Sequence, residues 1–348
     1  MGIVAHEPKD VREVSIGVIG CGGVVESLHL PALASISEVK IRWVCDSSAD
    51  RARSLARAWG VGQAFEQIDD CSDVDAVLVA TPVGTRQAIL AKTTERGWHA
   101  FCEKPFAISA NEHRHMLECG ARYGLILGAG YMRRHHWAVK QARDMMRSKV
   151  LGSLREITAS ESAQLERTGL DLSSYRNNAR ASGGGVLVET GCHLFDEVVF
   201  VSDAIRADVR TCAQQVWNDY EVETTATGCI ALGSGEQVAL KFAVSGTRPV
   251  FAGIAFRCEW GEVRLRIDPA KGLEVFLKQA HPYRLEVPHP RPGQQHVLAA
   301  FRCEWLHFLE AIRTPRGWDV SRETGLITSD FIAQCGEMAK VSRFAVPV

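Results

Sequence analysis

The sequence lacks the features that would point to a membrane, a nucleic acid or a secretion route. Its formal net charge is −1 over 348 residues, which gives no electrostatic reason to expect binding to nucleic acid or to an acidic membrane surface. No apolar run approaches the length of a membrane span, and residues 1–12 are polar without the apolar core of a signal peptide. We therefore expect a soluble, cytoplasmic protein with neither a nucleic-acid nor a membrane partner.

Metal-ligand spacing is also missing, although the chain has eleven cysteines. The cysteines are scattered, and no two form a C-x-x-C pair. Several lie in apolar stretches, where a reduced cysteine behaves as a small hydrophobic residue. We expect a reducing compartment and no metal site.

The order of apolar and helical stretches predicts two domains of the α/β class. Up to residue 130, short apolar strands alternate with helical stretches, which is typical of a doubly wound parallel sheet. After residue 151, β-like stretches follow one another with short turns, which predicts an open, mostly antiparallel sheet. The predicted domains are residues 1–130 and residues 131–348, the second of the α+β type with helices such as Ser321–Lys340.

A glycine cluster directly follows the first predicted strand. Gly20, Gly22 and Gly23 let the backbone turn tightly and approach a pyrophosphate at the start of the next helix, as in a Rossmann dinucleotide-binding domain. Val25 stands where the usual G-x-G-x-x-G has its third glycine. A tight loop without a nucleotide is the alternative. The predicted cofactor contacts here are Gly20, Cys21, Gly22, Gly23, Val24 and Val25.

An acidic residue ends the second predicted strand, Val39–Cys45. Asp46 stands where a carboxylate takes the hydroxyls of the adenosine ribose, and its charge would repel a 2′-phosphate. We therefore expect NAD rather than NADP, with Arg51 as a further cofactor contact. Nearby arginines leave NADP open, and Asp46 could instead cap the helix that begins near Asp50.

Polar residues follow two further strands at the edge of the sheet where such folds bind ligands. Thr81 and Pro82 end one strand, and Glu103, Lys104 and Pro105 end the next. We predict that Thr81, Pro82, Glu103 and Lys104 contact the cofactor, and Lys104 is the first catalytic candidate. A plain turn at Thr81 and a structural ion pair between Glu103 and Lys104 are the alternatives.

A second glycine-rich stretch, Gly183–Gly185, leads into an apolar, helix-like run. Glu189 and His193 are four residues apart and share a helix face, and Asp196 lies three residues further on. A carboxylate near an imidazole fixes its tautomer, and His193 is suited to take a proton from an alcohol. The predicted catalytic residues are Lys104, His193 and Glu189, with a structural histidine as the alternative.

Cationic residues mark the crossover between the domains. Arg133 and Arg134 would bind hydroxyls or a phosphate of a substrate, although a solvated helix start is the alternative. The predicted substrate contacts are Lys104, Arg133, Arg134, Tyr175, Arg176, Glu189 and His193. They suit a small polyhydroxylated ligand.

The strand Gln237–Ser245 alternates between two kinds of side chain. Val238, Leu240, Phe242 and Val244 make one apolar face, while the opposite face is smaller and mixed. Helices should cover only the apolar face. The other face would hold a second subunit in a dimer or tetramer, or remain solvated.

These pieces together resemble the Gfo/Idh/MocA oxidoreductase family. The resemblance rests on the glycine cluster with His29 and Pro31, on Glu103-Lys104-Pro105, on Gly130-Tyr-Met-Arg-Arg134, on Gly183–Gly185, and on Glu189 and His193 with Asp196. It implies a Rossmann domain, a second domain with an open sheet often used for oligomerisation, and an active site between them.

The resemblance also assigns roles and shows departures. Lys104 and His193 match the catalytic lysine and histidine of the family. Glu189 replaces its usual aspartate, Arg86 stands where histidine is common, and Val25 replaces a small residue.

The expected activity is hydride transfer between a nicotinamide and a secondary alcohol or ketone of a sugar, a cyclitol or a sugar derivative. Glycoside cleavage or elimination with transient use of NAD, and a non-catalytic NAD-binding regulator, are the alternatives.

Overall fold

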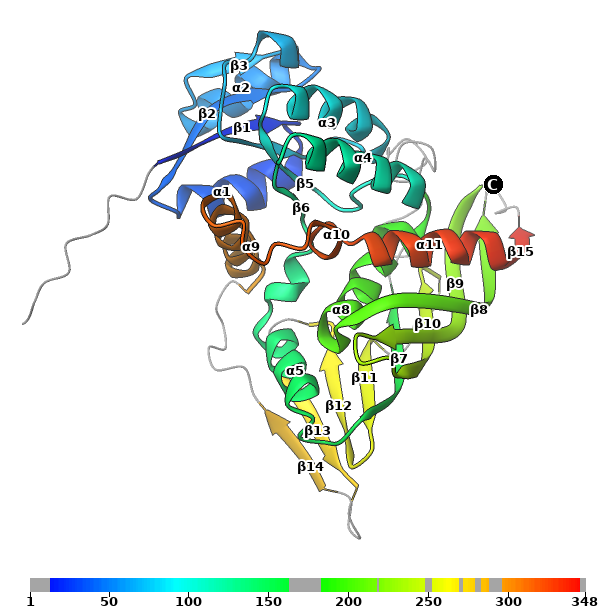
Figure 1. Ribbon diagram of the computed structural model, residues 1–348. Coiled ribbons are helices and arrows are strands. Elements are labelled where there is room, and N and C mark those ends of the chain that lie inside the picture. Colours follow the sequence, from blue (N-terminus) through cyan, green and yellow to red (C-terminus); the bar gives the residue numbers. More distant parts are fainter. Residues whose placement is uncertain are drawn as a thin grey trace, which may run out of the picture.

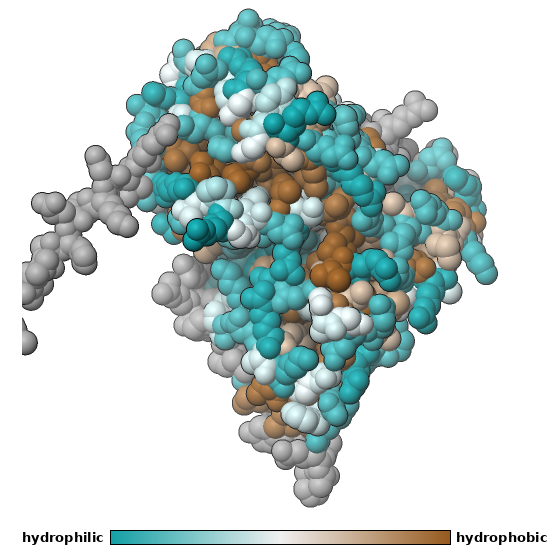
Figure 2. Space-filling model, viewed as in Figure 1, coloured by the Kyte–Doolittle hydropathy of each residue, from teal (hydrophilic) through white to brown (hydrophobic). Residues whose placement is uncertain are grey.

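The computed structural model describes residues 13–162, 183–217, 219–247, 252–268, 272–278, 283–287 and 296–344. The described chain forms two lobes, each built on its own sheet (Figure 1). Apolar side chains gather on the viewed face at the level where the lobes meet (Figure 2). Among the described residues, no helix is long and apolar enough to cross a bilayer.

The first lobe contains a six-stranded parallel sheet. Its order is β3-β2-β1-β4-β5-β6, so the order reverses between β1 and β4, where a doubly wound sheet opens a crevice for ligands. The strands are β1 (Val14–Ile19), β2 (Val39–Cys45), β3 (Gln63–Phe65), β4 (Ala76–Val79), β5 (His99–Cys102) and β6 (Leu127–Ala129). The predicted doubly wound parallel sheet is confirmed.

Helices flank this sheet, and one of them comes from the far end of the chain. The local ones are the π-helix η1 (Val25–His29), α1 (Leu30–Ala34), α2 (Ala49–Trp59), α3 (Arg86–Glu95) and α4 (Ala110–Arg122). The late helix α9 (His296–Arg313) lies beside α1 (Figure 1). Its residues Phe301, Trp305 and Phe308 belong to the core of the first lobe. A boundary at residue 130 therefore separates the two sheets but not the helices.

The second lobe contains a nine-stranded mixed sheet of order β14-β13-β12-β11-β7-β10-β9-β8-β15. The pairs β7–β10 and β8–β15 are parallel and the other pairs antiparallel, so the predicted mostly antiparallel sheet is confirmed. The strands are β7 (Leu154–Ser162), β8 (Ala204–Trp217), β9 (Tyr220–Leu232), β10 (Gln237–Ser245), β11 (Gly253–Cys258), β12 (Gly261–Arg266), β13 (Leu273–Leu277), β14 (Tyr283–Val287) and β15 (Ala339–Phe344).

The prediction of one helix over Ser321–Lys340 is wrong. The chain instead forms α10 (Val320–Glu323), α11 (Leu326–Met338) and then strand β15. The break lies at Gly325, whose φ of 77° is a left-handed conformation that ends a helix and that glycine adopts without strain.

Helices α5 (Trp137–Ser148), α8 (Cys192–Ser202) and α11 pack on one face of the second sheet. The alternation in β10 follows this arrangement, because Val238, Leu240, Phe242 and Val244 are at most 3% exposed while Lys241 is exposed. The opposite face of the sheet carries no helix in the described chain (Figure 1).

The two lobes are joined by a buried histidine on α4. The His113 ring is hydrogen-bonded through Nδ1 to Ser329 Oγ (2.8 Å) and through Nε2 to Thr324 Oγ1 (2.8 Å). Burial, with a smaller contribution from the positive charge of Arg114, lowers the pKa of His113 to about 3. The histidine is therefore a neutral link between α4 and the α10–α11 segment.

Candidate active site

The glycine loop leaves open space where the sequence predicts a pyrophosphate. Gly20 has a φ of 97°, and a Cβ there would lie 2.6 Å from the carbonyl oxygen of Ala80, so only glycine fits. A Cβ on Gly22 or Gly23 would meet nothing within 4 Å. Val25 is fully buried in the core of the first lobe, so this residue fills the place of the third glycine. The loop therefore fits a dinucleotide.

Asp46 lies against this loop. Its Oδ2 accepts from the backbone N–H of Cys21 (2.8 Å), and its Oδ1 accepts from the N–H of Ser48 (2.8 Å) and from Arg51 Nη2 (2.9 Å). Burial raises the pKa of Asp46, but these three donors outweigh it and hold the pKa below its ordinary value. The cap of α2 is Ser48, not Asp46. The anionic carboxylate thus stands beside the loop where a ribose would lie.

A hydrogen-bonded chain fixes the start of the Glu103-Lys104-Pro105 segment. Trp305 Nε1 donates to His29 Nδ1 (3.1 Å), so Nδ1 is the acceptor and Nε2 carries the proton that is donated to Glu103 Oε1 (2.9 Å). Glu103 Oε2 accepts from the N–H of Lys104 (3.0 Å). The Lys104–Pro105 peptide bond is cis. Neither His29 nor Trp305 was among the predicted site residues, and His29 was noted only in the family resemblance.

Burial and neighbouring charges compete at Glu103. Burial raises the pKa of this carboxyl, but the hydrogen bond from His29 and the positive charges of Lys104 and Arg86 hold the pKa below its ordinary value. Glu103 is therefore an anion inside the protein. Its carboxylate is hydrogen-bonded to His29 and to the backbone of Lys104 and does not extend toward a ligand.

Lys104 crosses from the first lobe to the second. Its Nζ donates to the backbone carbonyl of Glu189 (2.8 Å) in the π-helix η6 (Leu187–Gly191), which runs directly into α8. The Glu189 carboxylate accepts from the hydroxyl of Tyr220 on β9 (3.4 Å). The contact of Glu189 with the lysine is therefore made by its main chain.

The second glycine cluster explains how this helix reaches its place. A Cβ on Gly185 would lie 1.9 Å from the carbonyl oxygen of Glu221, so only glycine lets the segment approach β9 this closely. Glu221 Oε2 then accepts from the N–H of Leu187 (2.8 Å) at the start of η6. Burial raises the pKa of Glu221 to about 7.

His193 lies at the start of α8 and is partly buried. The ring of Tyr131 stands edge-on to it, with the ring centroids 6.1 Å apart. Burial and then the positive charges of Lys104 and Arg133 lower the pKa of His193 well below its ordinary value. Its Nδ1 is buried and has no hydrogen-bond partner among the described residues. His193 is therefore a neutral imidazole beside the lysine, and it can accept a proton.

The two crossover arginines are paired inside the protein. Arg134 Nε and Nη2 donate to the two oxygens of Asp196 (2.7 and 2.6 Å). Arg133 donates to both oxygens of Glu161 (2.8 Å each) and lies 3.5 Å from Glu197, whose pKa burial raises to about 7. These pairs contradict a solvated helix start, while contacts of Arg133 and Arg134 with a substrate stay a prediction.

The same ion pairs change the interpretation of Asp196. The helical spacing predicted that this carboxylate would lie with Glu189 and His193, but its oxygens are bonded to Arg134. Tyr175 and Arg176, the other predicted substrate contacts, lie outside the described residues. Among the described residues, no cluster of three or more His, Cys, Asp and Glu side chains could hold a metal ion.

Both lobes of the chain match one known protein family. A family described as oxidoreductases with an NAD-binding Rossmann fold matches residues 14–131, and the C-terminal domain of the same family matches residues 139–264. The chain belongs to the Gfo/Idh/MocA oxidoreductase family. A cofactor of the NAD type is thus indicated by the family as well as by the glycine loop.

The chain spans about half the length of the curated relatives that it matches. The rhizopine catabolism protein MocA of Rhizobium meliloti is 33% identical over 53% of this chain and 55% of that protein. D-Glucoside 3-dehydrogenase of Escherichia coli is 26% identical over 53% of each chain.

Solved structures match over nearly the whole chain. A 3-ketoreductase from Actinomadura kijaniata, in complex with NADP and TDP-benzene, superposes with a TM-score of 0.79 at 20% identity, over 96% of this chain and 100% of that one. Levoglucosan dehydrogenase, in complex with NADH and levoglucosan, gives a TM-score of 0.78 at 17% identity, over 94% and 98%. At these identities the match establishes the shared fold.

Proposed function

We propose that this protein is an NAD-dependent oxidoreductase that converts a secondary alcohol of a sugar, cyclitol or sugar derivative to a ketone, or the reverse. Lys104 and His193 are the acid–base pair. The observation that carries the proposal is the bond of 2.8 Å from Lys104 Nζ to Glu189 O, which holds the amine of one lobe beside the helix of the other lobe that bears His193.

The residues divide the work of the oxidation. NAD would be held by the glycine loop and Asp46, and it would supply the acceptor for the hydride of the carbinol carbon. His193, neutral because its pKa is low, takes the hydroxyl proton. The Lys104 ammonium donates a hydrogen bond to the same oxygen and stabilises the negative charge that develops there. In the reverse direction, His193 returns the proton as the carbonyl is reduced.

Asp46 supports NAD as the preferred cofactor. Its carboxylate is anionic and lies on the glycine loop, so it would accept from ribose hydroxyls and repel a 2′-phosphate. The structurally similar proteins include one bound to NADP and one bound to NADH, so both cofactors are compatible with the fold. The charge at residue 46 favours NAD here.

An uncharged ring is the substrate class that the site supports best. Arg133 and Arg134 would be suited to a phosphate, but each is paired with two carboxylates. Relatives include enzymes named for a glucoside and for glucose 6-phosphate. The paired arginines favour the uncharged kind.

A reduction screen tests these points together. NAD and NADP are each incubated with D-glucose, levoglucosan, myo-inositol, glucosamine, glucose 6-phosphate and dTDP-glucose, and the nicotinamide absorbance is followed. We expect turnover of an uncharged member with NAD. Lys104→Ala and His193→Ala should each lower kcat about 100- to 10,000-fold while NAD affinity is kept.

The other outcomes of the screen identify the alternatives. Product without net NADH would favour transient use of the cofactor, and NAD binding without turnover of any member would favour a regulator. Wild-type kcat in either variant would reject the assigned roles.

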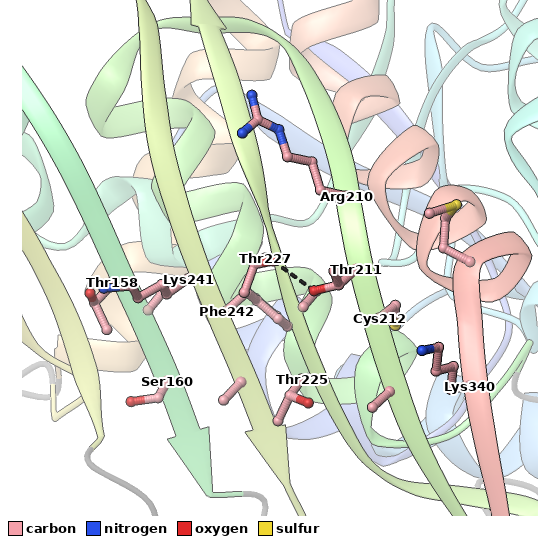
Figure 3. A pocket seen from close by; sticks show the side chains of 15 residues that line it. Thr158, Ser160, Arg210, Thr211, Cys212, Thr225, Thr227, Lys241, Phe242 and Lys340 are labelled. Carbon is pink, nitrogen blue, oxygen red and sulfur yellow. Dashed lines mark hydrogen bonds between the residues drawn. The ribbon is translucent and has the colours of Figure 1, made fainter.

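The uncovered face of the second sheet is a second proposal, an interface between two copies of this chain. Residues from five strands, among them Thr158, Thr211, Thr225, Lys241 and Lys340, line a hollow of about 550 Å³ there (Figure 3). Thr211 and Thr227, which are register partners on the neighbouring strands β8 and β9, are hydrogen-bonded to each other (2.6 Å). Thr227→Arg should shift the mass in light scattering toward the monomer; an unchanged mass would contradict the proposal.

A further inference from the structure

A buried arginine holds the segment that carries Lys104. Arg86 is the first residue of α3 and is 4% exposed. Its guanidinium donates to Thr81 O from Nε (3.0 Å) and Nη2 (2.7 Å), and to Glu103 O and Pro105 O from Nη1. Thr81 follows β4 and the other two residues follow β5, so one side chain bridges the ends of two neighbouring strands.

The contacts of Arg86 enclose Lys104 in the main chain. Glu103 precedes Lys104 and Pro105 follows it. The backbone carbonyls of both residues accept hydrogen bonds from Arg86. The N–H of Lys104 donates to Glu103 Oε2. The backbone is therefore held on both sides of the lysine, which sets the direction in which its side chain leaves.

We infer that Arg86 is a positioning residue that aims the amine of Lys104 at the reacting oxygen, an inference that rests on the function proposed above. It acts through the backbone of residues 103–105 and needs no contact with a substrate. The aim matters because a displacement of about 1 Å at a catalytic group can lower a rate about 100-fold.

The guanidinium is suited to this task in both charge and shape. The buried Glu103 carboxylate is held as an anion partly by the positive charge of Arg86. A lysine would supply the same charge, but only from a point at the end of a flexible stem, whereas the planar fork of arginine reaches several acceptors at once. The variant Arg86→Lys therefore keeps the positive charge but removes the hydrogen bonds that join the two strand ends.

The same helix offers a matched control. Arg96 follows the last residue of α3 and also donates to backbone carbonyls, those of Ile68 (3.1 Å) and Cys71 (2.7 Å). It lies at the opposite end of α3 from Arg86. Removing Arg96 costs the lobe a comparable set of bonds without touching the segment of Lys104.

Amide hydrogen exchange of the full chain tests the inference without any substrate. The amide of Lys104 should exchange at least about 10-fold faster in Arg86→Ala and Arg86→Lys than in the wild type, because local opening of the segment becomes easier. It should be unchanged in Arg96→Ala. Thermal melting confirms that each variant is folded. Wild-type exchange at Lys104 in folded Arg86→Ala would overturn the inference.

Kinetics then test whether the effect passes through the lysine. With D-glucose or myo-inositol and NAD, Arg86→Ala and Arg86→Lys should lower kcat about 10- to 100-fold with NAD affinity kept, and Arg96→Ala should not. Added guanidinium chloride should restore part of kcat in Arg86→Ala but not in Lys104→Ala. The double variant Arg86→Ala, Lys104→Ala should lose no more than about twofold beyond Lys104→Ala alone.

The experiments distinguish a failure of the inference about Arg86 from a failure of the proposed function. A full further loss in the double variant would show that Arg86 does not act through Lys104. Wild-type kcat in Lys104→Ala alone would reject the proposed function, whatever Arg86 does. If neither sugar is turned over, the exchange of the Lys104 amide decides the point by itself.

Discussion

The cofactor end and the substrate end of the site depend on contacts of different reach along the chain. Asp46 is bonded to Cys21, 25 residues away, and to Arg51, five residues away. At the other end, Lys104 reaches Glu189 across 85 residues, and Arg134 reaches Asp196 across 62. The cofactor end is thus made by a local motif, while the substrate end depends on how the two lobes pack.

The largest effect should come from breaking the long-range pair beside the substrate end. Arg134→Met leaves the Asp196 carboxylate buried without its cation, and we expect a loss of about 3 to 5 kcal/mol in the free energy of unfolding, measured in urea. Arg134→Met combined with Asp196→Leu should recover most of this loss. A single-variant loss below about 1 kcal/mol would show that the pair is not the anchor of this end.

The link between the lobes should fail in acid. Because the folded state holds the pKa of His113 at about 3, its stabilising contribution is complete above the unfolded pKa of about 6.5 and declines as the pH falls toward 3. From pH 6.5 to 5 this amounts to about 2 kcal/mol. His113→Gln should flatten that part of the curve of unfolding free energy against pH; an unchanged slope would contradict the neutral link.

Substitutions at two glycines of the cofactor loop should have different effects, one on the stability of the fold and the other on the binding of NAD. Gly20→Ala should cost at least about 1 to 2 kcal/mol of stability, because its left-handed backbone and the nearby Ala80 carbonyl exclude a side chain. Gly22→Ala should leave the free energy of unfolding within about 0.5 kcal/mol of the wild-type value. It should weaken the binding of NAD, because the methyl group enters the open space at the loop. Calorimetry with NAD and thermal melting measure the two effects. Equal behaviour of the two variants would contradict the loop geometry.

The smallest effect should be at Asp46. Asp46→Ala should lower the affinity for NAD about tenfold, since contacts with the ribose are lost. The affinity for NADP should stay the same or increase. Asp50→Ala is the matched control, because that carboxylate is exposed and paired only with Arg53 in the described contacts. A loss of NAD and NADP in equal proportion would mean that Asp46 does not select between them.

The same difference in reach explains what the sequence could predict. The parallel sheet, the glycine turn and the position of Asp46 follow from short patterns whose partners lie nearby in the chain. Lys104 was predicted from its place after a strand, since strand ends of a parallel sheet share one edge. Those inferences needed no knowledge of how the lobes pack.

The partners of the charged residues could not be predicted in that way. Helical spacing placed Asp196 with His193, yet the arginine that binds Asp196 comes from a distant segment. The role of Arg86 was also missed, because nothing in its neighbours indicates that three carbonyls from two strand ends converge on it. Its position four residues after Pro82 was the nearest signal.

The packing of α9 has a consequence for the order in which the molecule can form. Trp305 lies under β5, with its ring 4.6 Å from that of Phe101, and it donates to His29. A nascent chain therefore cannot close the hydrophobic interior of its first lobe until α9 (His296–Arg313) has left the ribosome. The lysine segment is bonded to that tryptophan through His29 and Glu103, so it gains its final support only after Trp305, about 200 residues later in the chain, has been synthesised.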